Sequence, residues 1–226
     1  MCGRYTLTKI DPAALKARFG IVGGLDFDER PRFNIAPTDP VLAVRETVEG
    51  RREAGRLRWG LLPGAWARGG ARTLINARAE TIEQQPAYRE SFLARRCLIP
   101  ADGFYEWRRT DRGNQPVWIS RRDEEPFAFA GIWASLAEGD GPPVRSCAIV
   151  TCEPNEVVRP IHDRMPVILD PEFEGTWIAD GADPATLRQL LRSPSADLLD
   201  VREVSDAVND VREDGPHLLE PPLRLF

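Results

Sequence analysis

The chain has 226 residues, of which 42% are hydrophobic and 29% charged, and its net charge is −5 at pH 7. This balance argues against long disorder, a fibrous repeat and a coiled coil, and the length fits one domain over residues 1–226. No apolar run approaches the ~18–20 residues that a membrane-spanning helix needs, and the first ten residues lack an apolar signal-peptide core. We therefore expect a cytoplasmic protein with no membrane contact.

The first hundred residues contain local signals for five elements. Asp11 precedes Pro12, and Gly20 follows an apolar segment, so this stretch predicts a helix with a polar cap and a terminal glycine. In chain order we expect a strand at 4–8, a helix at 12–19, strands at 41–46 and 56–62, and a helix at 86–96. The segments 23–40 and 63–85 lack a clear period and predict irregular structure.

The second half of the chain predicts most of a sheet. Short apolar segments bounded by glycine, proline or charged clusters indicate strands at 97–100, 103–107, 116–120, 127–133 and 144–151. Further on we expect a helix at 154–158, a strand at 166–170, helices at 171–179 and 184–192, and a strand at 198–204. Because strands and helices do not alternate regularly, the pattern favours an α+β fold with a mainly antiparallel, barrel-like sheet flanked by a few helices.

Cysteines and histidines are few and are not spaced for a metal. The cysteines are Cys2, Cys97, Cys147 and Cys152, and the histidines are His162 and His217. No C-x-x-C pair occurs, so we do not expect a zinc site of the usual spacing. We also expect no cofactor. In a chain of this length without an export signal, four cysteines favour reduced thiols over a disulfide framework. Cys2 therefore stands out as a free thiol at the second position.

Removal of Met1 would place a thiol and an α-amine on the same residue, Cys2. An α-amine has a pKa near ~7.7–8.0, so roughly a tenth of it is neutral at pH 7, far more than of a lysine amine. With an aldehyde, this amine could form a Schiff base and the thiol could then close a thiazolidine ring. With an amide, the same pair could act as nucleophile and base. A cysteine at this position is otherwise unremarkable, because reactivity requires an electropositive, accessible setting.

Three other side chains suit acid–base or hydrogen-bonding chemistry. Glu106 lies in the apolar segment GFYEW, where burial would raise its pKa, although an outward-facing position in an alternating strand explains it equally well. His162 lies at a turn before a strand, where a structural histidine is the plain alternative. Asn76 could bind a substrate or adduct through its amide, or simply cap a turn.

Six segments together resemble one family. They are MCGRYTL at 1–7, FNIAPT at 33–38, RWGLLP at 58–63, NARAET at 76–81, RRCLIPADGFYEW at 95–107 and HDRMPVIL at 162–169. In this order and over most of the chain, they resemble the SRAP (SOS response-associated peptidase) family of abasic-site processing proteins. The resemblance implies a mixed fold built around a barrel-like sheet, without a metal.

The resemblance also implies a covalent reaction with damaged DNA. Cys2 corresponds to the nucleophile that forms a thiazolidine with the ring-opened aldehyde of an abasic site in single-stranded DNA. Asn76, Glu106 and His162 correspond to its active-site partners. This chemistry would shield the lesion during a DNA damage response. Asp163, inside the last motif, has no role that we can assign.

The resemblance further implies single-stranded DNA containing abasic sites as the partner. Arg4, Arg78 and Arg164 fall at positions expected to hold phosphates. Residues 1–100 carry 17 basic and 11 acidic side chains, which suits a channel for the sugar–phosphate backbone despite the acidic total. Trp66 could stack on a base or act as a wedge, or be an ordinary buried tryptophan. When bound to DNA the protein would be associated with the nucleoid.

Two other classes of function remain open at this level. An N-terminal-nucleophile amidohydrolase or peptidase would also begin with a trimmed Met1 followed by Cys2, but would release ammonia from glutamine rather than trap an aldehyde. A plain DNA-binding module would use its arginines and leave Cys2 inert. Substitution of Cys2 separates these classes, because a pure binder keeps all its function. The sequence does not decide whether Met1 is removed by the protein itself.

Overall fold

The structure is a computed structural model that describes residues 2–25, 30–63, 73–111, 113–137 and 141–222. Its larger sheet contains β3 (Pro40–Glu46), β4 (Arg52–Trp59), β5 (Asn76–Arg78), β6 (Arg96–Ala101), β9 (Phe127–Leu136), β10 (Val144–Cys152), β11 (Met165–Pro166) and β12 (Ile168–Leu169). Its smaller sheet contains β1 (Tyr5–Leu7), β2 (Arg32–Ile35), β7 (Gly103–Thr110), β8 (Gly113–Arg121) and β13 (Leu199–Glu203).

The larger sheet closes on itself. Its strands pair in the order β10, β4, β3, β6 and β9, and β9 then pairs with β10 over Val144–Ile149. Most of these pairings are antiparallel, whereas β10 is parallel to β4 and β5. Closure removes the free edges that a sheet of this length would otherwise expose. The α+β fold with a barrel-like, mainly antiparallel sheet is therefore confirmed.

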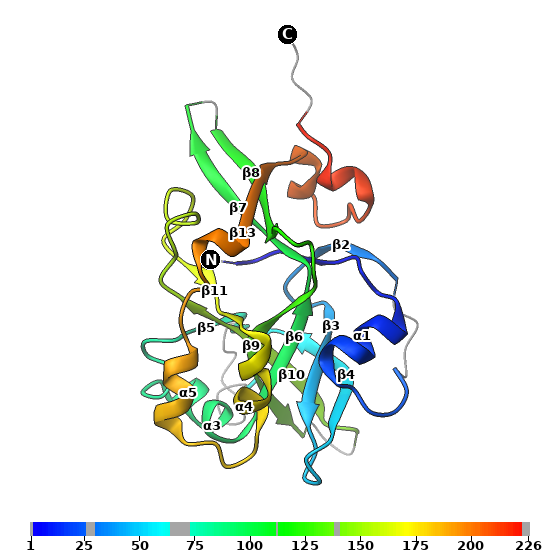
Figure 1. Ribbon diagram of the computed structural model, residues 1–226, viewed down its shortest axis with the longest axis vertical. Coiled ribbons are helices and arrows are strands. Elements are labelled where there is room, and N and C mark those ends of the chain that lie inside the picture. The colour runs from blue at the N-terminus through cyan, green and yellow to red at the C-terminus, as the bar shows by residue number, and fades with distance from the viewer. Residues whose placement is uncertain (1, 26–29, 64–72, 112, 138–140, 223–226) are drawn as a thin grey trace.

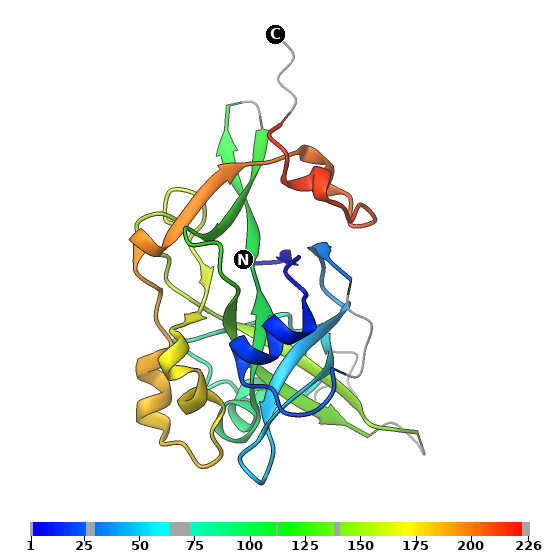
Figure 2. The same ribbon diagram turned by 45° about the vertical axis from the view of Figure 1, so that its right-hand side comes forward.

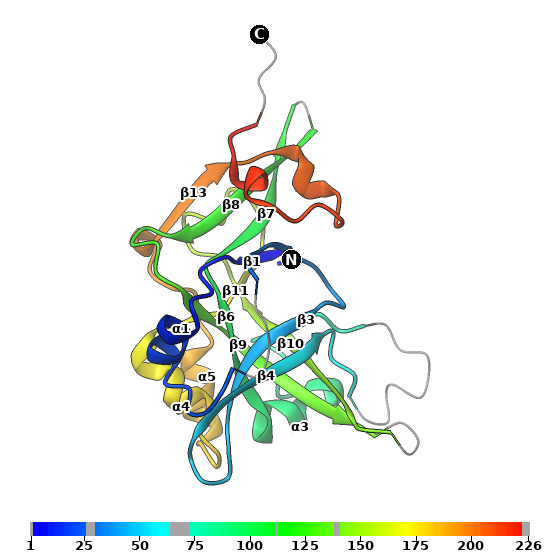
Figure 3. The same cartoon turned by 90° about the vertical axis from the view of Figure 1, so that its right-hand side faces the viewer.

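The smaller sheet covers one end of the barrel. Figure 1 shows β7, β8 and β13 grouped above the barrel strands, and β1 runs between the two groups (Figures 1 and 3). In sequence, β6 ends at Ala101 and β7 begins at Gly103, so the two sheets are joined almost directly. The start of the chain is thus held at the junction between the sheets, as the turned view also shows (Figure 2).

Short helices cover the barrel. They are α1 (Pro12–Phe19), α3 (Pro86–Ala94), α4 (Glu174–Ile178) and α5 (Pro184–Leu190). The Asp11 side chain accepts a hydrogen bond from the backbone of Ala14, and Gly20 ends α1 at φ 64°. A left-handed conformation suits glycine there because it has no Cβ. None of the helices within the described ranges combines the length and apolar character needed to cross a bilayer.

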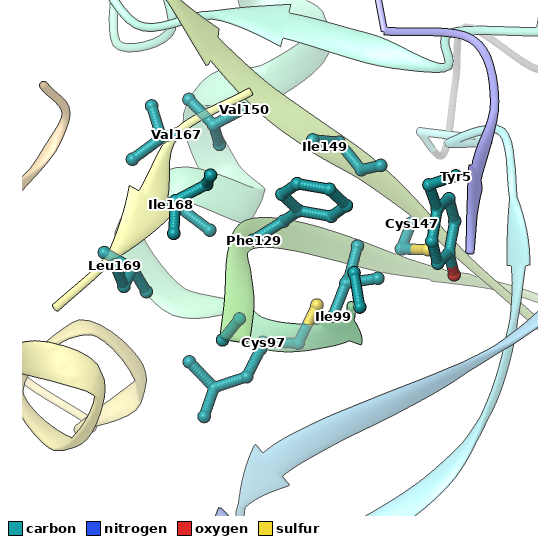
Figure 4. Close-up of a cluster of buried hydrophobic side chains, with 14 of the residues drawn as sticks. Tyr5, Cys97, Ile99, Phe129, Cys147, Ile149, Val150, Val167, Ile168 and Leu169 are labelled. Atoms are coloured by element: carbon teal, nitrogen blue, oxygen red, sulfur yellow. The ribbon is translucent and has the colours of Figure 1, made fainter. Parts of the chain in front are cut away.

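The apolar core fills the barrel and extends beneath β1. Tyr5, Phe129 and Ile149 lie in this cluster together with Cys97 and Cys147 (Figure 4). The Tyr5 ring packs edge-on against Phe129, with 5.6 Å between ring centroids, and against Trp59 at 5.3 Å. Burial of these rings anchors β1, and with it the residues that precede Tyr5.

Most predicted elements are observed within a few residues, but three differences are informative. The predicted helix at 154–158 is wrong, because this segment forms turns in which the Asn155 side chain accepts from the backbone of Val158. Asparagine favours such local bonds over helix, and Pro160 supplies no backbone donor. The strands β2 and β5 lie in segments predicted to be irregular. They form because β1 and β10 offer them partners, which local sequence does not reveal.

Candidate active site

Cys2 is fully buried at the junction of the two sheets. The backbone N–H of Tyr105 donates to the carbonyl of Arg4 at 3.0 Å, which attaches the start of the chain to β7. The Cys2 thiol points back to the same carbonyl, with 3.8 Å between Sγ and O. Burial raises the pKa of this thiol, and the nearby Glu106 carboxylate raises it further. The resting thiol is therefore protonated, and its reaction requires a group that takes the proton.

Glu106 is a buried carboxyl group on β7 and is only 2% exposed. Its neighbours fix the strand, because the Tyr105 hydroxyl donates to the carbonyl of Phe33 at 2.8 Å and the Trp107 indole donates to Asn209 at 2.8 Å. Burial raises the pKa of Glu106 to about 7, and the negative charge of Asp163 contributes to the rise. Near neutral pH, Glu106 can therefore either give or take a proton.

Asn76 is the first residue of β5 and contacts Cys2 directly. Its amide nitrogen donates to the Cys2 carbonyl at 2.9 Å, while its own backbone carbonyl accepts from the Tyr88 hydroxyl at 3.0 Å. The parallel pairing of Asn76 with Ile149 on β10 places it there. The Asn76 Oδ1 atom is buried without a hydrogen-bond partner among the described residues. It is an acceptor that a bound group could satisfy.

His162 lies in the turn that leads into β11. Its backbone N–H donates to Val158 at 3.0 Å, and its Nδ1 accepts from the backbone N–H of Arg164 at 3.0 Å. The Asp163 Oδ1 atom lies 2.8 Å from the same Nδ1. Partial burial lowers the pKa of His162, although Asp163 acts in the opposite direction. The imidazole is therefore mainly neutral at pH 7.

The predicted catalytic side chains thus come together from four distant parts of the chain. Asn76 bonds to Cys2, the charge of Glu106 acts on the Cys2 thiol, and the charge of Asp163 acts on both Glu106 and His162. Each arrives on a different element, namely the segment before β1, β5, β7 and the turn before β11. The result is one polar site built around the thiol of the second residue.

Arg4 and Arg78, two of the predicted phosphate-binding arginines, differ in how exposed they are. Arg4 is half-buried, and its Nη1 donates to Asn34 at 2.9 Å and to the carbonyl of Val208 at 2.8 Å. Arg78 is exposed at the end of β5, two residues from Asn76. Arg78 is consequently the more accessible of the two for a phosphate, whereas Arg4 also holds the C-terminal segment in place.

Arg164 is largely engaged with the protein. It is 8% exposed, and its two terminal nitrogens each lie 2.8 Å from a carboxylate oxygen of Glu80. The same guanidinium donates to the carbonyl of Thr151 at 2.6 Å. Such a bidentate pair orients both partners. Arg164 therefore fixes the start of β11 and the turn that carries His162.

A cavity of about 470 Å³ lies beside the site and was not predicted. Its lining residues are Gly3, Arg4, Ala36, Pro37, Thr38, Asp39, Trp107 and Val211. Thr38 adopts φ 80°, a conformation that is costly for a β-branched residue. Three of the family-like segments, MCGRYTL, FNIAPT and GFYEW, contribute residues to the cavity lining. Asn34 in the FNIAPT segment is buried and donates to carbonyls of Asp210 and Glu213, which holds the C-terminal segment against it.

Trp66, which was predicted to stack on a base or act as a wedge, lies outside the described residues.

Among the residues that the structure does describe, no group of three or more His, Cys, Asp or Glu side chains is arranged to hold a metal ion.

The chain is thus an α+β protein with a closed barrel and a second sheet. Its polar site lies around the second residue. The family model described as SOS response associated peptidase (SRAP) matches residues 1–211, and the chain belongs to this family. Among its relatives, the abasic site processing protein YoqW of Bacillus subtilis is 39% identical, covering 97% of this chain and 99% of that protein. YedK of Escherichia coli, also named an abasic site processing protein, is 31% identical, covering 98% and 100%.

Solved structures support the fold. A crystal structure of a protein from Bacteroides thetaiotaomicron superimposes with a TM-score of 0.84, covering 98% of this chain and all of the other at 24% identity. A phage-related protein from Bordetella bronchiseptica superimposes with a TM-score of 0.71 at 28% identity, covering 90% and 94%. These solved proteins therefore share the arrangement of strands seen here.

Proposed function

We propose that this protein processes abasic sites in single-stranded DNA by forming a thiazolidine crosslink through Cys2 after Met1 has been removed. The observation that carries the proposal is the fixed position of Cys2, whose carbonyl accepts from Asn76 and whose thiol is close enough to Glu106 to be influenced by its charge. Membership of the SRAP family supports it, as do relatives that are named abasic site processing proteins. The crosslink would shield the lesion during a DNA damage response.

The chemistry of the proposal balances without an oxidant or a cofactor. The Cys2 amine attacks C1′ of the ring-opened sugar, and loss of one water from the resulting carbinolamine leaves an imine. The thiol then adds to the imine carbon, forming the C–S bond, and the thiol proton moves to nitrogen. The five-membered ring contains the sulfur, the nitrogen and C1′, and the only molecule released is water.

The neighbouring side chains supply the proton transfers. Glu106, with a pKa near 7, takes the α-ammonium proton and exchanges protons during imine formation and ring closure. An abasic sugar is mostly a closed hemiacetal, so a second group must help to break the bond between C1′ and the ring oxygen. We assign this step to His162. Asn76 Oδ1, buried without a protein partner among the described residues, would accept from the ring N–H of the adduct.

The DNA backbone would lie along the basic first part of the chain. Arg78 is the arginine best exposed for a phosphate, and Arg4 contributes from the wall of the 470 Å³ cavity. We propose that Arg164 acts mainly by fixing the His162 turn through Glu80, in addition to its charge. Binding of this kind depends on phosphates rather than on base identity, so it should weaken with salt.

The proposal is tested by incubating the protein with a single-stranded DNA that bears one abasic site. A product that survives denaturation, and whose mass equals the sum of both components less one water and less Met1, is expected. An undamaged DNA of the same sequence serves as the control. Release of ammonia from glutamine without any such product would instead favour the N-terminal-nucleophile amidohydrolase. Binding that is equal on both DNAs, without a covalent product, would favour a plain binding module.

A further inference from the structure

Asp163 has no role in the chemistry described so far, yet its carboxylate lies at the active site. Its Oδ1 atom is 2.8 Å from Nδ1 of His162, while its side chain remains 84% exposed. It also influences Glu106, because its negative charge raises the pKa of that buried carboxyl group. Asp163 therefore acts electrostatically on both predicted acid–base residues.

Two groups compete for the same nitrogen of His162. The backbone N–H of Arg164 lies 3.0 Å from Nδ1 and requires a lone pair there, as in the neutral imidazole with its proton on Nε2. The Asp163 carboxylate can only accept, so it requires a proton on Nδ1. The Arg164 amide therefore suits the neutral ring and Asp163 suits the protonated ring. Protonation of the ring therefore replaces the hydrogen bond from the Arg164 amide by one to Asp163.

The remaining contacts keep this arrangement in position. The Arg164 guanidinium is held by Glu80 and by the carbonyl of Thr151, and the His162 backbone is tied to Val158. Two charged groups of the described residues act on the imidazole in opposite directions: the Asp163 carboxylate favours the protonated ring, and the Arg164 guanidinium disfavours it.

We propose that Asp163 is a positioning residue for sugar-ring opening. When the imidazole of His162 is protonated, the Asp163 carboxylate accepts a hydrogen bond from its Nδ1–H. This inference rests on the proposed function. In the step concerned, His162 donates a proton from Nε2 to the ring oxygen as the bond from that oxygen to C1′ breaks. Glu106 takes the proton of the C1′ hydroxyl, which becomes the aldehyde. Asp163 forms no bond to the substrate, and stabilises the imidazolium that donates the proton.

The test replaces the carboxylate by an amide of the same shape. Asp163→Asn should lower the pKa of His162, measured by NMR titration of the imidazole. The chain has only one other histidine, His217, whose Nε2 lies 3.3 Å from Glu213. The His217 titration should be unchanged and serves as an internal control. Asp200→Asn controls for loss of charge, because it removes an exposed carboxylate on β13 that lies 3.9 Å from Arg122.

The kinetic arm uses two DNAs, one with a natural closed abasic site and one with an aldehyde that is already open. Single-turnover crosslinking by Asp163→Asn should be slower by about threefold to tenfold on the closed site at pH 7. It should change by less than about twofold on the open aldehyde, because that substrate bypasses the step. Asp200→Asn should match the unmodified protein on both.

The outcomes separate this inference from the proposed function. If the unmodified protein crosslinks but Asp163→Asn keeps its rate on the closed site, or keeps the His162 titration, Asp163 is not the positioning residue. Equal slowing on both DNAs would also overturn the assignment to ring opening. If the unmodified protein forms no stable product on either DNA, the proposed function fails, and the inference fails with it.

Discussion

Two regions of the molecule bury cysteine thiols, and they differ in what surrounds the sulfur. Cys97 and Cys147 lie among apolar side chains in the barrel core, next to Ile99, Phe129 and Ile149 (Figure 4). Burial raises the pKa of Cys97 to about 12 and that of Cys147 well above its ordinary value. Cys2 is just as buried, and burial raises its pKa as well.

The difference lies in the polar groups within reach. Around Cys2 are the Asn76 amide and the Glu106 carboxyl, and removal of Met1 would add an α-amine. The core thiols lie among apolar side chains, and the charged group that acts on Cys97 is the Arg45 guanidinium, which is not a proton acceptor. Burial alone makes a thiol inert, because it disfavours the thiolate. A buried thiol becomes useful only where a neighbouring group can move its proton. The following predictions test this contrast, from the largest expected effect to the smallest.

Removal of the Cys2 thiol should affect the adduct, whereas removal of the Cys147 thiol should affect stability. Cys2→Ala should reduce the denaturation-stable adduct by more than about a hundredfold while leaving non-covalent DNA binding nearly intact. Its α-amine remains, so borohydride should still trap an imine. Cys147→Ala should keep the adduct and lose about 1 kcal/mol of unfolding free energy. Denaturing gels and urea titrations measure the two effects, and a persistent adduct in Cys2→Ala would sink the assignment.

The acid–base groups should separate by substrate. His162→Ala should slow crosslinking about a hundredfold on the closed abasic site, and a DNA whose aldehyde is already open should restore much of the rate. Glu106→Ala should stay slow on both DNAs, because imine formation and ring closure always need its proton transfers. Single-turnover rates from pH 5 to 9 provide the measurement. Equal rescue of both variants, or of neither, would show that the two roles are wrongly divided.

The buried Glu106 should lower the free energy of unfolding, whereas the apolar core raises it. Burial raises the pKa of Glu106 from an ordinary 4.5 to about 7, so the folded chain holds this proton more tightly than the unfolded chain. Folding stability is therefore lost as the pH rises from 4.5 through 7. Glu106→Gln should stabilise the protein by about 2–3 kcal/mol at pH 8 and by little at pH 4.5, in urea titrations.

A control variant shows whether this gain belongs to the buried position. Glu203→Gln removes a partly exposed carboxylate that lies 3.5 Å from Arg108. Its effect should be small at both pH values. If Glu106→Gln were equally stable or less stable than the unmodified protein at pH 8, burial of the Glu106 carboxylate would not destabilise the fold.

The smallest effects should come from the arginines. Arg78→Ala should weaken binding to all single-stranded sequences alike, by about threefold to tenfold, and reduce the salt slope by roughly 0.7 for one lost phosphate contact. Arg164→Ala should change the salt slope less than Arg78→Ala, because its guanidinium is committed to Glu80, and should mainly destabilise the fold through loss of that bidentate pair. Affinity measured across salt concentrations provides the test. A changed sequence preference with an unchanged slope would make either residue a base reader.

The sequence alone was sufficient for the parts whose causes are local. The cap and glycine of α1 depend on neighbours along the chain, and so do the short apolar segments, bounded by glycine, proline or charged residues, that form β6 to β10. The chemistry available to Cys2 also follows from its position, because only an N-terminal residue has an α-amine. The motifs then indicated which distant residues belong with it.

Tertiary structure decided the rest, because those features depend on residues far apart in sequence. The strand β5 exists through its pairing with β10, and that pairing brings the Asn76 amide to the Cys2 carbonyl. The commitment of Arg164 to Glu80 could not be predicted from an arginine in a motif. Nor could the pKa of Glu106 near 7, which depends on burial in the folded chain and on the charge of Asp163. Desolvation and long-range pairing are properties of the folded chain, and no local segment contains them.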